Sequence, residues 1–412
     1  MSEETLVVER IAAGGDGVAR AEDGIVVFLP RTAPGDRVRA SVRREKRLGR
    51  GRVLEVLEAG PQRVAPPCAH YVHDHCGGCQ LQHLAYEAQL SAKGQIIHDA
   101  LRRIGGRQQA PPEVRPSAAQ WRYRRKLTLA MPRVNGDVTA GLHPYFDPVG
   151  VFRLRDCPIT EERVLAVWKE VLVARRFLPN ARRLRGAVRA FDDGAASFTL
   201  EGGPSWPRVR DFFDAVPSLA ELWWEPEGGR RRLLRERARP QAGASFTQVN
   251  AAVAAALHAH VVERVAAHAP ATVVDAYAGA GDTAAPLAAR GMAVTAIEID
   301  RAAAARCAER LPAGSQALAG PVESLLPQAL PADVVILNPP RAGVDERVTR
   351  ALQDAARPPR AIVYVSCNPA TLARDLARLP GYRIASVLGF DMFPQTAHVE
   401  TVCELRREEE TP

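Results

Sequence analysis

The chain has 412 residues, of which 46% are hydrophobic and 25% are charged, so it is a globular protein too long for a single core. No apolar run reaches the roughly 18 residues of a membrane span, and the N-terminus lacks the pattern of a signal peptide. We therefore expect a cytoplasmic protein without membrane contact. We also expect it to act as a monomer. The net charge of +8 favours an anionic partner.

Residues 5–58 carry apolar pairs and triplets between Gly and Pro, which predicts the short strands of a small β-barrel. Between Arg37 and Arg52 there are eight basic residues and one acidic residue, Glu45. This stretch is either a solvated hairpin or, because small basic barrels often hold single-stranded nucleic acid, part of an RNA site. We predict a first domain over residues 1–60.

Three cysteines cluster after a Pro-rich linker, and a fourth lies far downstream; they are Cys68, Cys76, Cys79 and Cys157. The glycines at 77 and 78 allow the backbone to wrap a ligand. Four thiolates suit either tetrahedral zinc or a [4Fe–4S] cluster, and the spacing alone does not choose between them. A mixed cysteine–histidine zinc site is a competitor because histidines lie nearby, namely His70, His73, His75 and His83.

Residues 84–106 have helical spacing and end in two glycines, which predicts a helix. Residues 121–132 are expected to form a strand that alternates basic and aromatic side chains. Such a strand either stacks bases and holds phosphates or simply has a charged face. Residues 133–235 predict mostly short strands and turns, so we assign 61–240 to a mostly β central domain, whose helix 84–106 is able to pack on the domain that follows.

Residues 241–412 predict a doubly wound α/β domain, because strands and helices alternate there after an Ala-rich helix. The first strand is followed by a turn with Gly279 and Gly281, and the second strand ends in Glu298. Glycines let the backbone approach a nucleotide and the acid holds ribose hydroxyls, as in a Rossmann-like sheet. The turn lacks the third glycine of dinucleotide binders, which favours S-adenosylmethionine.

The stretch AIVYVSCNP at 361–369 predicts a buried strand stopped by a turn, with Cys367 just beyond its carboxyl end. Open α/β sheets bind ligands at this place. A lone cysteine is more often a small buried apolar residue. The nucleotide-binding pattern upstream and the carboxylate of Glu400 downstream favour a functional thiol instead.

These motifs together resemble one family. SCNP around Cys367, FTQVN at 246–250, PPRAG at 339–343, HVET at 398–401 and the four cysteines resemble the RNA uracil-5-methyltransferase family over nearly the whole chain. The front barrel resembles a TRAM domain of the branch that modifies 23S rRNA. The resemblance implies a class I, Rossmann-like methyltransferase domain, a TRAM/OB-like barrel before it, and a central domain with an iron–sulfur cluster.

The resemblance also implies roles for individual residues. Cys367 would attack C6 of uracil, and Glu400 would remove the C5 proton after methyl transfer. The cofactor contacts that it implies are Gln248, Tyr277, Gly279, Asp282, Glu298 and Asn338. Asn338 stands where the family usually has Asp, and Pro321 stands where it has a polar residue near the adenine. At the four cysteines the resemblance favours a [4Fe–4S] cluster over zinc.

We therefore expect methyl transfer from S-adenosylmethionine to C5 of a uridine in 23S rRNA. A tRNA uridine methyltransferase is the alternative in the same class. A non-catalytic RNA-binding protein on a methyltransferase scaffold is a second alternative, motivated by Asn338 and Pro321. The presence of both Cys367 and Glu400 argues against the second alternative.

Overall fold

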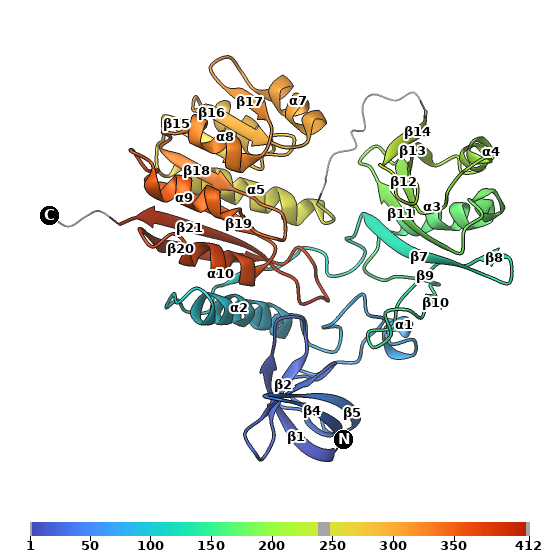
Figure 1. Cartoon of the computed structure of the whole chain (residues 1–412). Coiled ribbons are helices and arrows are strands. Elements are labelled where there is room, and N and C mark those ends of the chain that lie inside the picture. Colours follow the sequence, from blue (N-terminus) through green and yellow to red (C-terminus); the bar gives the residue numbers. More distant parts are fainter. Residues whose placement is uncertain (1, 238–247, 409–412) are drawn as a thin grey trace.

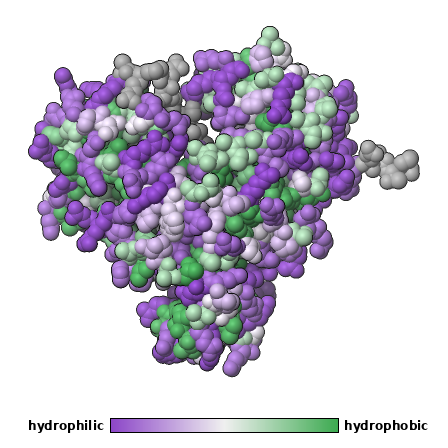
Figure 2. Space-filling model, turned by 180° about the vertical axis from the view of Figure 1, so that it is seen from behind, coloured by the Kyte–Doolittle hydropathy of each residue, from purple (hydrophilic) through white to green (hydrophobic). Residues whose placement is uncertain are grey.

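Three β-sheets follow one another along the chain (Figure 1). The computed structural model describes residues 2–237 and 248–408, and it contains an N-terminal barrel, a middle sheet and a C-terminal sheet. Hydrophilic residues cover most of the face seen in Figure 2, where the barrel projects as a separate lobe. Within the described ranges, every helix is too short or too polar to cross a membrane.

The N-terminal sheet closes into a barrel with the strand order β1-β2-β3-β5-β4. Its strands are β1 (Ser2–Ile11), β2 (Gly17–Arg20), β3 (Val26–Leu29), β4 (Arg37–Glu45) and β5 (Leu48–Glu58). Side chains alternate along β1 and β4, so that Leu6, Val8, Val38 and Val42 point inward and form part of the barrel core. The small β-barrel predicted at the front of the chain is confirmed.

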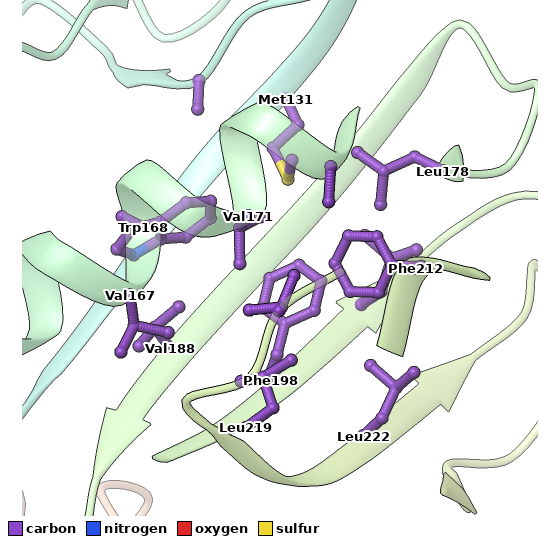
Figure 3. Close-up of a cluster of buried hydrophobic side chains, with 14 of the residues drawn as sticks. Met131, Val167, Trp168, Val171, Leu178, Val188, Phe198, Phe212, Leu219 and Leu222 are labelled. Atoms are coloured by element: carbon purple, nitrogen blue, oxygen red, sulfur yellow. The ribbon is translucent and has the colours of Figure 1, made fainter. Parts of the chain in front are cut away.

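The middle sheet has the order β10-β9-β7-β11-β12-β13-β14, with β8 paired to β7. Its strands are β7 (Lys126–Val134), β8 (Asp137–Val138), β9 (Gly141–Leu142), β10 (Phe152–Arg153), β11 (Arg183–Ala190), β12 (Ala196–Glu201), β13 (Leu219–Glu225) and β14 (Arg232–Glu236). One face is covered by α3 (Glu162–Val173), the 3-10 helix η1 (Ala174–Phe177) and α4 (Val209–Asp214). Figure 3 shows Trp168 and Val171 of α3 above this face, and the rings of Trp168 and Phe198 lie 5.7 Å apart.

Two features of the middle region differ from expectation. The strand expected at 121–132 begins only at Lys126, because Arg122 has a left-handed backbone with φ of 52° that interrupts an extended chain. Helix α3 was not expected at all. Its buried residues recur at helical spacing, namely Val164, Val167, Trp168 and Val171.

The C-terminal sheet has the order β17-β16-β15-β18-β19-β21-β20-β6. Its strands are β15 (Thr272–Ala276), β16 (Ala293–Glu298), β17 (Gln316–Ala319), β18 (Val334–Leu337), β19 (Ala361–Ser366), β20 (Tyr382–Phe390), β21 (Glu400–Arg407) and β6 (Val114–Arg115). The strands from β17 to β19 are parallel, whereas β21 runs antiparallel between β19 and β20.

Helices cover both faces of this sheet, which confirms the predicted α/β architecture. One core lies under α5 (Ala251–Ala266), α6 (Ala284–Ala288) and α7 (Arg301–Arg310). The other lies under α8 (Val322–Ala329), α9 (Glu346–Asp354) and α10 (Pro369–Ala377).

Helix α2 (Tyr86–Arg103) follows α1 (Ala69–Val72) and the cysteine cluster in sequence but packs on the C-terminal sheet. Its Ile97 and Leu101 belong to the core under α10. The next strand, β6, pairs with the end of β20. In Figure 1, α2 lies between the barrel and α10, so this early segment links the barrel to the C-terminal sheet.

Candidate active site

The carboxyl ends of four neighbouring parallel strands place several predicted site residues at one edge of the C-terminal sheet. Glu298 ends β16, Tyr277 follows β15, Asn338 follows β18 and Cys367 follows β19. These strands are adjacent and in parallel register, so the four residues form a row along that edge. Ligands of open α/β sheets bind in such a row.

The turn after β15 is tied to the end of β16. Gly279 has a φ of 57°, and a side chain at this position would project into open space. The Gly279 N–H donates to Oε2 of Glu298 at 2.8 Å, and the Asp300 N–H donates to Oε1 at 2.8 Å. The Glu298 carboxylate is thereby fixed at the rim and keeps lone pairs for hydroxyl groups of a ligand.

Two features of the turn were not foreseen. Gly281 lies against Cys307, whose Sγ would be 2.7 Å from an added Cβ, so the glycine is needed for close packing. Asp275, buried beneath the turn, accepts a hydrogen bond from Thr283 while its Oδ1 has no partner. Burial raises the pKa of Asp275 to about 7. An orphaned carboxylate oxygen at this place fits a site that is completed by a polar ligand.

Two further predicted cofactor contacts, Gln248 and Asp282, lie outside this row of strand ends. Gln248 is half-buried and lies two residues before Asn250, whose side chain caps α5. The residues at 246 and 247 of the same motif lie outside the described ranges. Asp282 is exposed and pairs with Arg310, with Oδ1 2.8 Å from a guanidinium nitrogen. Its carboxylate is therefore already engaged at the surface.

Cys367 and Glu400 face each other across two adjacent strands. In the antiparallel register of β19 and β21, Ser366 pairs with Thr401, so the next position along places Cys367 opposite Glu400. Glu400 is only 5% exposed, whereas Cys367 is half-buried and reachable. The turn is fixed by Asn368, whose side chain accepts from the Ala370 N–H at 3.1 Å at the start of α10.

Burial and charge set the protonation of this pair. Burial raises the pKa of Glu400 to about 7, and the nearby charge of Arg341 opposes this rise. Burial also raises the pKa of the Cys367 thiol, and the Glu400 carboxylate adds to the rise while Arg341 opposes it. Arg341 thus acts on both groups. Arg341 is the arginine of the PPRAG motif, but the motif alone did not predict a role for it.

The four predicted metal-binding cysteines gather in the region between barrel and middle sheet. Cys68, Cys76 and Cys79 are buried, and Cys157 is half-buried beside them. Burial, with smaller contributions from the charges of Cys157 and Cys68, raises the pKa of Cys76 to about 11, which places these thiols in the same region. In the described part of the chain, no three His, Cys, Asp or Glu side chains converge as ligands of one metal ion. A bound cluster therefore stays a prediction.

Three of the four histidines near these cysteines have other partners. Nδ1 of His70 lies 2.7 Å from Oδ2 of Asp74, and its Nε2 accepts from the Arg155 N–H at 3.0 Å. His83 is buried against the Tyr71 hydroxyl, and His75 packs edge-on against Tyr145. These contacts argue against the mixed cysteine–histidine alternative.

The segment before β7 is used inside the protein rather than displayed for bases. Tyr123 is buried, and its hydroxyl donates to the carbonyl of Pro394 at 3.0 Å. The guanidinium of Arg122 donates to both carboxylate oxygens of Asp156, at 2.9 and 3.0 Å. The hypothesis that this segment stacks bases is therefore wrong for Tyr123. The Arg125 N–H donates to the carbonyl of Val249 at 3.0 Å, which joins the middle sheet to the edge of the site.

Comparisons with known proteins find relatives over nearly the whole chain. A family profile described as tRNA (Uracil-5-)-methyltransferase matches residues 327–408. An uncharacterized RNA methyltransferase of Gloeobacter violaceus is 34% identical, with 98% of this chain and 96% of that protein aligned. The 23S rRNA (uracil(1939)-C(5))-methyltransferase RlmD of Chromohalobacter salexigens is also 34% identical, over 98% of this chain and 89% of that protein.

One solved structure shares the whole fold. It is the tRNA (uracil-54, C5)-methyltransferase of Pyrococcus abyssi in complex with S-adenosyl-L-homocysteine. It matches with a TM-score of 0.69 and 23% identity, and covers 98% of this chain and 100% of that one. The C-terminal sheet with its helices, the barrel and the middle sheet thus form a methyltransferase fold.

Proposed function

This chain belongs to the RNA uracil-5-methyltransferase family of S-adenosylmethionine-dependent enzymes, and we propose that it methylates C5 of a uridine in 23S rRNA through a covalent bond to Cys367. The observation that carries the proposal is the placement of Cys367 opposite Glu400 at the ligand-binding edge of the sheet. C5 of uracil is a poor nucleophile, so a thiol and a base at one site supply what the reaction lacks.

Cys367 opens the reaction by adding its sulfur to C6 of the uracil ring. The electron pair of the C5=C6 bond moves toward O4, so that C5 becomes nucleophilic and is methylated. Glu400 then takes the proton from C5, the electron pair of that C–H bond restores C5=C6, and the thiolate leaves. A carboxylate with a pKa raised to about 7 is a better proton acceptor than an exposed one.

Arg341 is proposed to favour the thiolate form of Cys367. Its positive charge lowers the pKa of the thiol against the effects of burial and of Glu400. It is exposed, so it is also free to contact the RNA as the base enters. In this way the Arg341 guanidinium would lower the pKa of both Cys367 and Glu400.

S-adenosylmethionine supplies the electrophilic methyl group. The residues proposed to hold it are the ones implied by the family resemblance, namely Gln248, Tyr277, Gly279, Asp282, Glu298 and Asn338. The open space over Gly279 and the fixed carboxylate of Glu298 fit a bound nucleoside. Asp282 is the weakest member of the set because Arg310 already occupies its carboxylate.

The outer face of the middle sheet is proposed to grip the RNA backbone. Lys126 and Arg189 are paired across β7 and β11, and Arg185 lies on the same face. Burial lowers the pKa of Lys126, and the charges of Arg189, Arg231 and Arg185 lower it further, whereas Glu201, which is paired with Arg185, opposes the shift. Cations that repel one another in this way are stabilised by phosphate groups. Arg125, just before β7, donates a backbone hydrogen bond to Val249, so this face lies next to the segment that carries Gln248.

We also propose that Cys68, Cys76, Cys79 and Cys157 hold a [4Fe–4S] cluster. The four cysteines are buried or half-buried in the same region, and their charges affect one another's thiol pKa, which supports a cluster site formed by all four. Iron analysis tests this directly, because anaerobically purified protein should contain about four irons per chain. One tightly bound zinc in colourless protein would contradict it.

The choice of 23S rRNA over tRNA is supported by the RlmD relative, whereas the family profile keeps a tRNA substrate as the alternative. The test is to incubate purified protein with unmodified 23S rRNA and unmodified tRNA and to map 5-methyluridine by mass spectrometry. We expect the modification at one or more uridines of 23S rRNA. Methylation of tRNA alone would refute the proposed substrate and leave the reaction class intact.

A further inference from the structure

The loop that delivers Glu400 to the site is itself buried. Residues 391–399 connect β20 to β21, and Glu400 is the first residue of β21. Asp391 and Met392 are fully buried, and Gln395 is 2% exposed. Gln395 also has a left-handed backbone with φ of 69°. Such a loop needs strong partners to keep one conformation.

Helix α2 supplies these partners from one face. Tyr86, Gln89 and Lys93 are spaced i, i+3 and i+7, so their side chains line the same side of the helix. Lys93 Nζ lies 2.5 Å from Oδ1 of Asp391, and neither side chain is exposed to solvent. The Tyr86 hydroxyl donates to the other carboxylate oxygen at 2.8 Å.

The same helix also holds the middle of the loop. Gln89 and Gln395 form two hydrogen bonds of 3.0 Å, one between their side chains and one from the Gln395 N–H to the Gln89 carbonyl oxygen Oε1. Lys93 Nζ donates a second bond, of 3.1 Å, to the carbonyl of Phe393. The loop is thus fixed at three successive odd positions, 391, 393 and 395, by a helix about 300 residues earlier in the chain.

The network continues to the side of the methyl donor. The Ser117 N–H donates to the Tyr86 hydroxyl at 2.8 Å, and the Ser117 hydroxyl oxygen accepts from the Asn250 side chain at 3.0 Å. Asn250 caps α5 and lies two residues after Gln248. One chain of buried polar groups therefore connects the loop of the base with the segment of a proposed donor contact.

A buried ion pair is a poor way to gain stability, because the desolvation of both charges offsets most of their attraction, and apolar residues of equal volume often stabilise a fold more. The Asp391 carboxylate, which accepts hydrogen bonds from both Lys93 and Tyr86, instead gives the loop a defined geometry. We propose that Lys93, acting through Asp391, is a positioning residue for Glu400 in the removal of the C5 proton. Lys93 touches no reacting atom.

This inference rests on the proposed covalent mechanism. In that mechanism the ring is already bonded to Cys367 when Glu400 acts, so the carboxylate must meet a proton whose position is fixed by another strand. A displacement of about 1 Å costs as much as about 100-fold in rate. Loss of the contact between Lys93 and Asp391 should therefore slow proton removal, while addition of the thiol and methyl transfer continue. The methylated ring would then remain attached to the protein.

The test uses two variants of the whole protein. Lys93→Met with Asp391→Asn removes both charges and keeps side-chain volume. Tyr86→Phe removes two hydrogen bonds, to Asp391 and from Ser117, without changing charge. Each is given RNA and S-adenosylmethionine with a labelled methyl group, and label in the denaturation-resistant protein–RNA complex is counted. We expect kcat to fall about 10- to 100-fold in the double variant and less in Tyr86→Phe, with labelled complex accumulating in both. The KM for S-adenosylmethionine should stay within about twofold.

Tyr382→Phe is the matched control. Its hydroxyl donates a buried 2.8 Å hydrogen bond to the carbonyl of Pro359 at the far end of β20, so it loses a comparable contact away from the loop. It should not accumulate labelled complex. Wild-type turnover without accumulation in Tyr86→Phe and in the double variant would overturn the positioning role, and if the double variant does not fold, Tyr86→Phe alone decides. Methylation by Cys367→Ala would instead overturn the proposed mechanism itself.

Discussion

Replacing Glu400 by glutamine should make the protein more stable at neutral and alkaline pH while removing its activity. The carboxylate is 5% exposed, and burial raises its pKa from 4.5 to about 7. That shift corresponds to a penalty of about 3 kcal/mol against the ionised form in the folded protein. Glutamine carries no charge, so most of this penalty disappears.

The sign of the pH dependence follows from the direction of the shift. A carboxyl group whose folded pKa lies above its unfolded pKa lowers stability as pH rises from about 4.5 to about 7, and the full penalty applies above that range. Glu400→Gln should therefore unfold with a free energy about 2–3 kcal/mol higher than the wild type at about pH 8. At about pH 5 the difference should be small, since the wild-type carboxyl is then mostly protonated.

Glu404 on the same strand provides the control of opposite sign. Burial acts to raise its pKa, but hydrogen bonds from Arg406 and His268 outweigh burial, so that its pKa is lowered. Its ionised form stabilises the fold above its unfolded pKa, and Glu404→Gln should be destabilised at about pH 8. Urea unfolding followed by circular dichroism at both pH values measures these differences. Equal stability of Glu400→Gln and wild type at about pH 8 would refute the raised pKa assigned to the buried Glu400 carboxyl.

Three further predictions address the donor, the nucleophile and the RNA. Glu298→Ala should weaken S-adenosylmethionine binding by about 1–3 kcal/mol in calorimetry, because the ligand hydroxyl groups lose a half-buried hydrogen-bond acceptor; unchanged affinity would remove Glu298 from the site. Arg341→Met should raise the pKa of Cys367, so the pH profile of covalent adduct formation should move upward, and an unmoved profile would exclude its role. Lys126→Glu should weaken RNA binding and make its salt dependence shallower, as filter binding at several salt concentrations would show, whereas S-adenosylmethionine binding should not change.

Local patterns in the sequence were enough to predict individual helices and strands. The helix predicted at 84–106 is α2 (Tyr86–Arg103), and the strand predicted before Cys367 is β19 (Ala361–Ser366). Helix α3 was missed although Val164, Val167, Trp168 and Val171 have the spacing of a buried helix face. The signal was present there, and the neighbouring basic and turn-forming residues obscured it.

Pairings between distant segments could not be predicted in this way. Cys367 and Glu400 meet because β21 inserts antiparallel beside β19, which depends on the packing of the whole sheet. The contact of Lys93 with Asp391 joins residues 298 positions apart, and no local pattern encodes it. A local pattern can also mislead. The alternation of basic and aromatic residues around Tyr123 suggested base stacking, but Tyr123 makes a buried contact with the loop before Glu400.

The most direct test of the central claim is to identify the atom of the protein that bonds to the base. A 23S rRNA fragment containing 5-fluorouridine is incubated with the protein and S-adenosylmethionine, digested, and analysed by tandem mass spectrometry. Because fluorine cannot be removed as a proton can, we expect a methylated 5-fluorouridine attached to the peptide that carries Cys367. Methylated RNA without any attached peptide, or attachment at another cysteine such as Cys307 or Cys403, would contradict the account.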